Sequence, residues 1–151
     1  MAAEDTAAQR QSSRTLELRI PSELGWERHA MDLAASVAGR MGFPVERVDD
    51  IKTAVSEAAL NAIEHGNRLD ASRKVLVVLV PEGETLQINV HDLSPTPFTP
   101  GEEAPDLESK LAGLQNTRGW GTFLIQSLVD EAEFSSTSEG NVVRMVIHLE
   151  S

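Results

Sequence analysis

The feature that most restricts the fold of this chain is the order of strand-like and helix-like patterns of apolar residues along it. Several short stretches alternate apolar and polar residues or are rich in β-branched side chains, which is typical of strands, while three longer segments have helical spacing. The expected strands are 14–20, 74–80, 86–90, 132–137 and 142–149, and the expected helices are 23–41, 44–64 and 118–129. This order predicts an α+β fold, a two-layer α/β sandwich with a mixed, mostly antiparallel sheet of about five strands and three helices on one face.

Turn and capping residues set the expected ends of these elements. Ser22 is placed to cap the first helix, and Gly66 to end the second as a C-cap glycine. The run 74–80 (KVLVVLV) is β-branched and too short for an unaided helix, so we expect a strand that is buried on both faces. Residues 93–117 combine prolines with many acids, and a loop of that length in a compact domain is functional or disordered.

The length of 151 residues corresponds to one domain. Residues 1–13 consist mainly of Ala, Gln, Ser and charged residues, so we expect a disordered N-terminal segment followed by a single domain over 14–151. The first residues lack the basic segment and the following apolar segment of a secretory signal peptide. No stretch reaches the roughly 18 consecutive apolar residues of a membrane-spanning helix. These features predict a cytoplasmic protein that does not enter a membrane.

Charge and cysteine content exclude several classes of function. The chain has no Cys, which rules out disulfides and finger-type zinc sites. Its formal net charge is −11, so the surface as a whole would repel a nucleic-acid backbone. Any anionic ligand must therefore be held by local features of a site.

A polar column on the second expected helix is the first candidate for chemistry. Glu57, Asn61 and His65 lie at i, i+4 and i+8, so they share one side of the helix and border its apolar stripe. A carboxylate there can act as a general base, and a carboxamide oxygen can bind Mg²⁺. His65 is placed to orient the helix end or contact a ligand. The alternative is a solvated helix face.

Asp92 follows the third expected strand and precedes a turn that contains Ser94. A carboxylate at a strand end can accept a hydrogen bond from an exocyclic amine such as that of adenine. The alternative is a simple turn aspartate.

The residues Gly119, Trp120, Gly121 and Thr122 open the third expected helix. Two glycines leave backbone N–H groups uncovered where the helix dipole is positive, which is a potential phosphate site. Arg118 directly precedes this turn and Lys110 lies upstream, so both can add positive charge. The alternative is that the glycines serve only capping and packing.

In these residues and their order, the chain resembles the Bergerat-fold ATP-binding family shared by histidine kinases, gyrase-type ATPases and Hsp90. The resemblance covers residues 14–150 and is strongest to anti-sigma factor serine/threonine kinases. Residues 55–66 (VSEAALNAIEHG) match the family's N box, V-S-E-A-x-x-N-A-x-x-H-G. Residues 119–131 (GWGTFLIQSLVDE) match its last glycine box, G-x-G-x-x-L-I-x-x-L-x-D-E.

The resemblance implies a role for each matching residue. Glu57 would be the catalytic base, Asn61 the Mg²⁺ ligand that bridges the ATP phosphates, and Asp92 the residue that reads adenine. The glycine-box residues Gly119, Trp120, Gly121 and Thr122, with Arg118, Lys110 and His65, complete the implied nucleotide site. The loop between Phe98 and Arg118 would be the ATP lid. The implied function is an ATP- and Mg²⁺-dependent serine/threonine protein kinase that phosphorylates an anti-sigma antagonist (STAS-type) partner, with a sigma factor as a further partner.

One box departs from the family. The middle box, D-x-G-x-G or D-x-G-x-P, reads Asp92-Leu93-Ser94-Pro95-Thr96 here, with Ser94 in place of the first Gly. A Cβ at that point restricts how the backbone approaches adenine. The alternative function is therefore a non-catalytic module that binds nucleotide or sequesters a sigma factor. A detached histidine-kinase catalytic domain is a third interpretation, without a phosphoacceptor helix in this chain.

Trp26 and Leu33 on the first expected helix are candidates for a homodimer or partner surface. Packing in the core is the alternative for both.

Overall fold

The computed structural model describes residues 14–93 and 117–149. The segment expected to be disordered, 1–13, and most of the expected lid lie outside the described residues. The described strands form a sheet of five with the order β1-β2-β3-β5-β4, and each neighbouring pair is antiparallel. The strands are β1 (Leu16–Pro21), β2 (Lys74–Glu82), β3 (Thr85–His91), β4 (Glu131–Thr137) and β5 (Gly140–His148).

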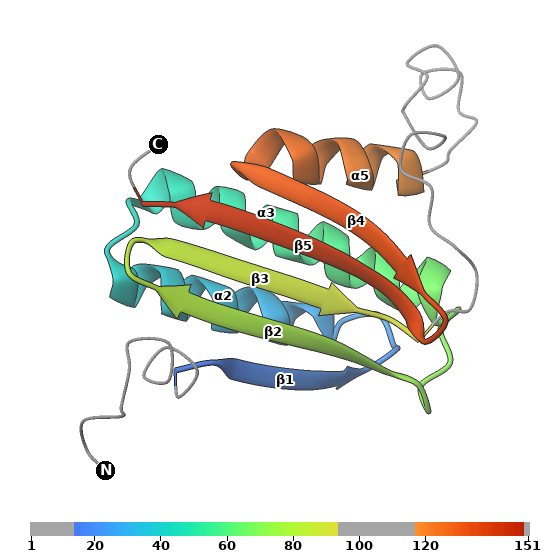
Figure 1. The fold of residues 1–151 in the computed structure, drawn as a ribbon. Helices are drawn as coiled ribbons and strands as arrows, with labels where there is room; N and C mark the ends of the chain where they lie inside the picture. Colours follow the sequence, from blue (N-terminus) through green and yellow to red (C-terminus); the bar gives the residue numbers. More distant parts are fainter. Residues whose placement is uncertain (1–13, 94–116, 150–151) are drawn as a thin grey trace.

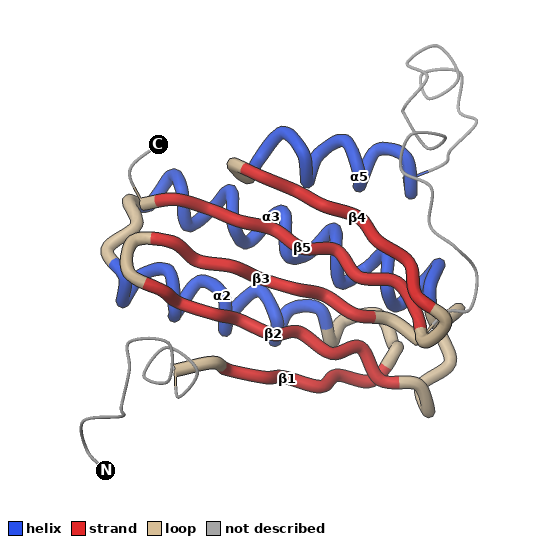
Figure 2. Tube along the Cα trace, viewed as in Figure 1, coloured by secondary structure: helices blue, strands red, loops and turns tan. Residues whose placement is uncertain are grey.

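The helices cover one face of this sheet (Figures 1 and 2). They are α2 (Glu27–Met41), α3 (Val45–Asn61), the π-helical turn η2 (Ala62–Gly66) and α5 (Thr117–Leu128). The expected two-layer α+β fold is thus confirmed. Among the described residues, no helix has both the length and the apolar character that a membrane span requires.

The core lies between the sheet and the helices. In β2, Val75, Val77 and Leu79 are fully buried beneath the helical layer. Leu76 and Val78 lie on the opposite face, which the described helices leave open, and are only partly buried. The expectation that β2 is buried on both faces was therefore wrong: its apolar run reflects β propensity on one face as well as core packing on the other.

α3 is the central helix of its layer, since it packs against both α2 and α5. Its buried stripe is mostly small, with Ala54, Ala58 and Ala59 beside Ile51 and Val55. Small side chains allow neighbouring helices to approach closely. The polar residues beside this stripe are consequently brought against the first half of α5.

Two expected caps are corrected by the structure. Ser22 does not cap α2, which begins at Glu27 after Trp26. Instead Ser22 is fully buried, and its hydroxyl donates to the carbonyl oxygen of Arg73 at 2.6 Å. A hydrogen bond to a distant loop has therefore replaced the local one that the sequence suggests.

Gly66 is not a left-handed C-cap either. The positive φ angles after this helix belong to Arg68 (53°) and Leu69 (61°). The helix widens into η2, which closes with a hydrogen bond of 2.8 Å from the N–H of Asn67 to the carbonyl of Ala62. Glycine is needed at this position because Asp92, at the end of β3, approaches it closely.

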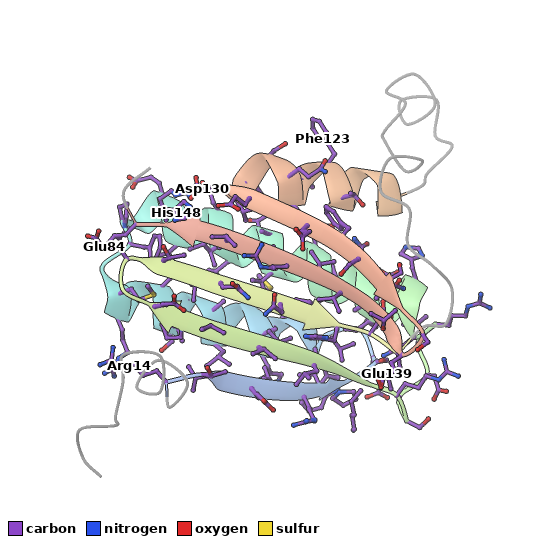
Figure 3. The ribbon with its side chains drawn as sticks, in the orientation of Figure 1. Arg14, Glu84, Phe123, Asp130, Glu139 and His148 are labelled. Carbon is purple, nitrogen blue, oxygen red and sulfur yellow. The ribbon has the colours of Figure 1, made fainter. Side chains whose placement is uncertain are left out.

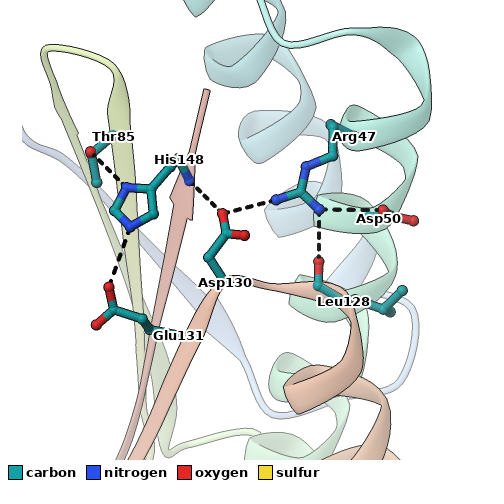
Figure 4. A network of polar contacts seen from close by, with 7 residues as sticks. All are labelled: Arg47, Asp50, Thr85, Leu128, Asp130, Glu131 and His148. Carbon is teal, nitrogen blue, oxygen red and sulfur yellow. Dashed lines mark hydrogen bonds and ion pairs between the residues drawn. The ribbon is translucent and has the colours of Figure 1, made fainter. Parts of the chain in front are cut away.

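A polar cluster holds the C-terminal end of α5 against the start of α3 (Figure 4). The guanidinium of Arg47 donates to Asp130 at 3.0 Å and to the carbonyl of Leu128 at 3.3 Å. Asp130 also accepts a 2.7 Å hydrogen bond from the N–H of His148. Asp130 and His148 lie at one end of the sheet, and Glu139 lies at the other (Figure 3). The cluster therefore fixes α5 at the end away from the β4–β5 turn.

Candidate functional site

The glycine box meets the N box where α5 packs on α3. A Cβ atom on Gly121 would lie 2.9 Å from Nδ2 of Asn61 and 3.0 Å from Oε2 of Glu57. Both distances are shorter than ordinary side-chain contacts, so only glycine fits here without displacing a neighbour. Glu57 and Asn61, which the sequence places on one helix face, therefore converge on a single point of α5.

Glu57 is a carboxylate in a partly buried position. Its pKa is raised above the ordinary value of 4.5, first by burial and second by the negative charge of Glu64. A raised pKa makes the ionised carboxylate a better proton acceptor. Glu57 thus has the chemistry of a general base.

Asp92 lies at the end of β3, against η2 and β5. A Cβ on Gly66 would lie 2.5 Å from Cγ of Asp92, so the glycine allows the carboxylate to approach the helix end. The backbone N–H of Asn141 donates to Oδ1 of Asp92 at 3.0 Å, and its side-chain amide donates at 3.4 Å. Asp92 is therefore held in place by donors from β5.

Gly140 brings β5 close to the same strand end. Its φ is +145°, a conformation that favours glycine, and a Cβ there would lie 2.9 Å from the carbonyl carbon of Asp92. Beside it, the hydroxyl of Ser136 donates to Oδ1 of Asn141 at 2.6 Å, which leaves the amide nitrogen of Asn141 directed to Asp92. The orientation of Asn141 is thereby fixed.

A cavity of about 20 Å³ lies between these groups, enough for roughly one water molecule. Its polar lining comes from Asn61, His65, Asp92 and Asn141, and its apolar lining from Ala58, Ala62, Val90 and Val143. Three residues singled out from the sequence, Asn61, His65 and Asp92, thus line one space. Apolar walls with a few convergent polar groups are typical of ligand sites.

The first turn of α5 carries the predicted phosphate-binding residues. The described part of α5 starts at Thr117, and Arg118, Gly119 and Trp120 lie in its first described turn. Gly121 and Thr122 lie one turn further in, and Thr122 is buried. Ser94 and Lys110 lie outside the described residues.

Metal ligands are sparse in the described part of the chain. Within residues 14–93 and 117–149 there is no cluster of three His, Asp or Glu side chains that could hold a metal ion. Mg²⁺ commonly takes only one or two protein ligands and completes its shell with water and substrate phosphates. The side-chain oxygen of Asn61 is a hard donor that suits such a partial site.

Two site-lining or site-adjacent residues were missed from the sequence. Asn141 appears there as part of a Gly-Asn turn, and only the pairing of β3 with β5 brings it opposite Asp92. Asn67 appears as a polar connector, yet it is fully buried and bonds the N–H of Leu93. Neither contact has a local signal in the sequence.

Residues 20–147 match the family described as "Histidine kinase-like ATPase domain". Among curated relatives, the chain is 26% identical over 145 residues to "Serine-protein kinase RsbW" of Bacillus subtilis (strain 168), covering 89% of this chain and 85% of the relative. It is 31% identical over 146 residues to "Anti-sigma F factor" of Thermoanaerobacter sp. (strain X514), covering 90% of this chain and 94% of the relative.

Solved structures share the fold. The RsbU and RsbW domains of a Mycobacterium tuberculosis protein align with a TM-score of 0.64 at 18% identity, over 89% of this chain and 32% of that one. The SiaB-SiaC complex from Pseudomonas aeruginosa aligns with a TM-score of 0.60 at 16% identity, over 97% of this chain and 99% of that one.

Proposed function

Since the chain belongs to the histidine kinase-like ATPase domain family, we propose that it is a cytoplasmic ATP-dependent serine/threonine kinase whose substrate is an anti-sigma antagonist of the STAS type. The curated relatives named above carry the names of a serine-protein kinase and an anti-sigma factor, which supports this function. The observation that carries the proposal is the contact of Gly121 with both Glu57 and Asn61. It joins a potential base, a potential metal ligand and the phosphate-binding helix in one place.

The residues around the cavity fit an adenine nucleotide. Gly66 and Gly121 each stand where a Cβ would fill the space beside a polar side chain, Asp92 in one case and Asn61 in the other. Asp92 is an acceptor suited to the exocyclic amine of adenine, and Asn141 holds that carboxylate in position. The site therefore has a base-reading end and a phosphate end, separated along η2.

Glu57 accepts the proton of the partner's seryl or threonyl hydroxyl in this mechanism. Its raised pKa favours proton uptake, and its position beside Gly121 directs it to the phosphate end of the site. The first-turn N–H groups of α5, with Arg118, hold the transferred phosphate by hydrogen bonds and by the helix dipole. Positioning and charge stabilisation supply most of the catalysis in phosphoryl transfer.

Asn61 is the proposed Mg²⁺ ligand, through its side-chain oxygen. Bound Mg²⁺ would supply positive charge to the phosphates. That charge matters in a chain of net charge −11, which otherwise repels a polyanion. His65, Thr122, Lys110 and Ser94 complete the proposed nucleotide-binding set.

Trp26 is the proposed contact for a protein partner, either a second copy, the antagonist or a sigma factor. The residue is 40% exposed, and the centroid of its ring lies 4.9 Å from that of the His29 ring. Leu33 packs instead against the core. The exposed surface at the start of α2 is therefore centred on Trp26.

The test is transfer of labelled γ-phosphate from ATP to a purified STAS-domain antagonist. The wild-type chain should transfer phosphate, and Glu57→Gln should lose transfer while still binding ATP. Glu46→Gln, which changes an exposed carboxylate in the first turn of α3, is the matched control and should be active. Equal transfer by wild type and Glu57→Gln would remove Glu57 as the base.

A second candidate is a module that sequesters its partner without turnover. The small size of the cavity and the presence of Ser94 in the middle box favour it. Titration calorimetry with Mg·ATP separates the two functions. Micromolar binding supports the kinase, whereas retained binding of a partner protein without any nucleotide binding supports the module.

A further inference from the structure

Asn67 is fully buried, and its side-chain amide contacts the residue that follows Asp92. Its Oδ1 accepts a 2.8 Å hydrogen bond from the backbone N–H of Leu93. Its Nδ2 donates to the hydroxyl of Ser22 at 3.0 Å and to the carbonyl of Lys74 at 3.2 Å. A buried amide with three such bonds holds its neighbours firmly, because losing one would leave a polar group unpaired away from water.

These bonds join three segments that are distant in sequence. Ser22 follows β1, Asn67 follows η2, and Leu93 follows β3 and is the residue next to Asp92. Ser22 also donates to the carbonyl of Arg73, so its remaining lone pair accepts from Asn67. The chain leaves β3 in a direction that Asn67 sets.

The amide is the side chain that satisfies all three partners. Leu93 presents a donor, while Lys74 presents an acceptor, so the side chain must accept on one atom and donate on the other. An aspartate would lose the donors, and an alanine would lose every bond. The orientation of the amide is therefore determined by its neighbours rather than by its own rotamer alone.

We infer that Asn67 is a positioning residue for base recognition, which acts through Leu93 to fix the Asp92 carboxylate for the 6-amino group of adenine. This inference rests on the proposed function. Asp92 is held on one side by Asn141 through its carboxylate and on the other by Asn67 through the adjacent peptide. Fixing both the side chain and the backbone restricts the carboxylate to one place.

The inference separates base reading from phosphate binding. The side-chain hydrogen bonds of Asn67 reach Ser22, Lys74 and Leu93, whereas Glu57 and Asn61 meet at Gly121. Loss of Asn67 should therefore weaken discrimination between bases and leave binding of the phosphates unchanged.

The experiment compares Asn67→Ala with wild type by titration calorimetry, using Mg·ATP and Mg·GTP on the full chain. We expect the affinity for ATP to fall about tenfold, the effect of losing roughly one good hydrogen bond, while the affinity for GTP stays within about twofold. The ratio of the two affinities should fall by the same factor of about ten. Ser72→Ala is the matched control, because it removes the hydrogen bond from the Ser72 hydroxyl to Asp70 in the same connection and does not touch Leu93.

Each outcome decides the inference. An unchanged ratio of ATP affinity to GTP affinity in Asn67→Ala would overturn the inference. An equal loss of both affinities is one such result, and it would indicate a structural role only. If Asn67→Ala does not fold, Ser22→Ala decides, since it loosens the amide without removing it. We then expect a smaller fall in the ratio and faster hydrogen exchange at the N–H of Leu93, and an unchanged ratio would overturn the inference. A wild-type chain that binds no nucleotide would overturn the proposed function and this inference with it, whereas a wild-type preference for ATP that survives in the variants overturns the inference alone.

Discussion

Gly121 leaves room for the side chain of Asn61, since a Cβ at this position would stand 2.9 Å from its amide nitrogen. This close approach brings together the N box on α3 and the glycine box on α5, which are far apart in the sequence. It also limits how far α5 can move without losing Asn61 as a neighbour.

Gly121→Ala should abolish phosphate transfer and weaken ATP binding by at least about tenfold, because the added methyl group displaces Asn61 and Glu57. The fold should survive, since alanine is favoured over glycine in a helix by about 1 kcal/mol, which offsets part of the strain. Calorimetry and thermal unfolding measure the two effects separately. Gly39→Ala in α2 is the control: nothing lies within 4 Å of its Cβ, so it should be fully active and slightly more stable.

Phosphate transfer should fall as the pH is lowered through the pKa of Glu57, because the protonated form cannot accept a proton. This acidic limb should lie above the ordinary value of 4.5. Glu64→Gln removes the second cause of the raised pKa and should shift the limb to lower pH. A pH–rate profile of both proteins checks the shift, and a limb that stays in place would assign the titration to another group.

Glu57→Gln should raise the stability of the protein at pH 7. A carboxyl group whose folded pKa is above its unfolded pKa favours the folded state below the unfolded value, and it loses that contribution as the pH rises through the folded value. At pH 7 the ionised group therefore costs stability, which glutamine avoids. We expect the midpoint of thermal unfolding to rise by roughly 1–3 °C at pH 7, a modest effect because the group is partly solvated. The gain should shrink near pH 4, and a gain independent of pH would contradict the linkage.

Removal of Mg²⁺ with a chelator should weaken ATP binding by at least about tenfold in the wild type, if Asn61 and the metal together offset the negative charge of the chain. Asn61→Ala should reduce binding of Mg·ATP and leave the weak binding of metal-free ATP nearly unchanged. Calorimetry with and without the metal measures both. An ATP affinity indifferent to Mg²⁺ in the wild type would contradict the proposed phosphate site.

Arg47→Ala should destabilise the fold by about 1–3 kcal/mol, because it removes the guanidinium that pairs with Asp130 and with the carbonyl of Leu128 in a partly buried place. The side chains of Arg47 and Asp130 are only 24% and 23% exposed. Arg19→Ala is the control, since its ion pair with Glu17 is 62% and 52% exposed and should contribute less than about 0.5 kcal/mol. Urea denaturation distinguishes the two.

Local periodicity was sufficient to predict much of this molecule. The alternation in β1 and β3 and the helical spacing of Glu57 and Asn61 are properties of neighbouring residues, so the strands, the helices and the polar column could be read from the chain. The two layers followed from the order of these elements.

The remaining features depend on pairing between distant segments. Gly66 is required by the approach of Asp92, and Asn141 is placed by the register of β5 against β3. Ser22 has a good local position for a cap, yet it bonds a loop some fifty residues away. No local pattern carries such information, which is why these residues were assigned wrongly or not at all.

Within residues 14–93 and 117–149, β4 is an edge strand of the sheet, and it places Glu131 and Glu133 in exposed positions beside three exposed hydroxyl residues, Ser135, Ser136 and Thr137. A free edge can recruit strands from other molecules into continuous sheets, and charges along it oppose that growth. The acidic character of the chain therefore has a protective effect at this edge: it discourages aggregation of the folded protein. Replacing both glutamates by β-branched residues would remove that protection without touching the nucleotide site.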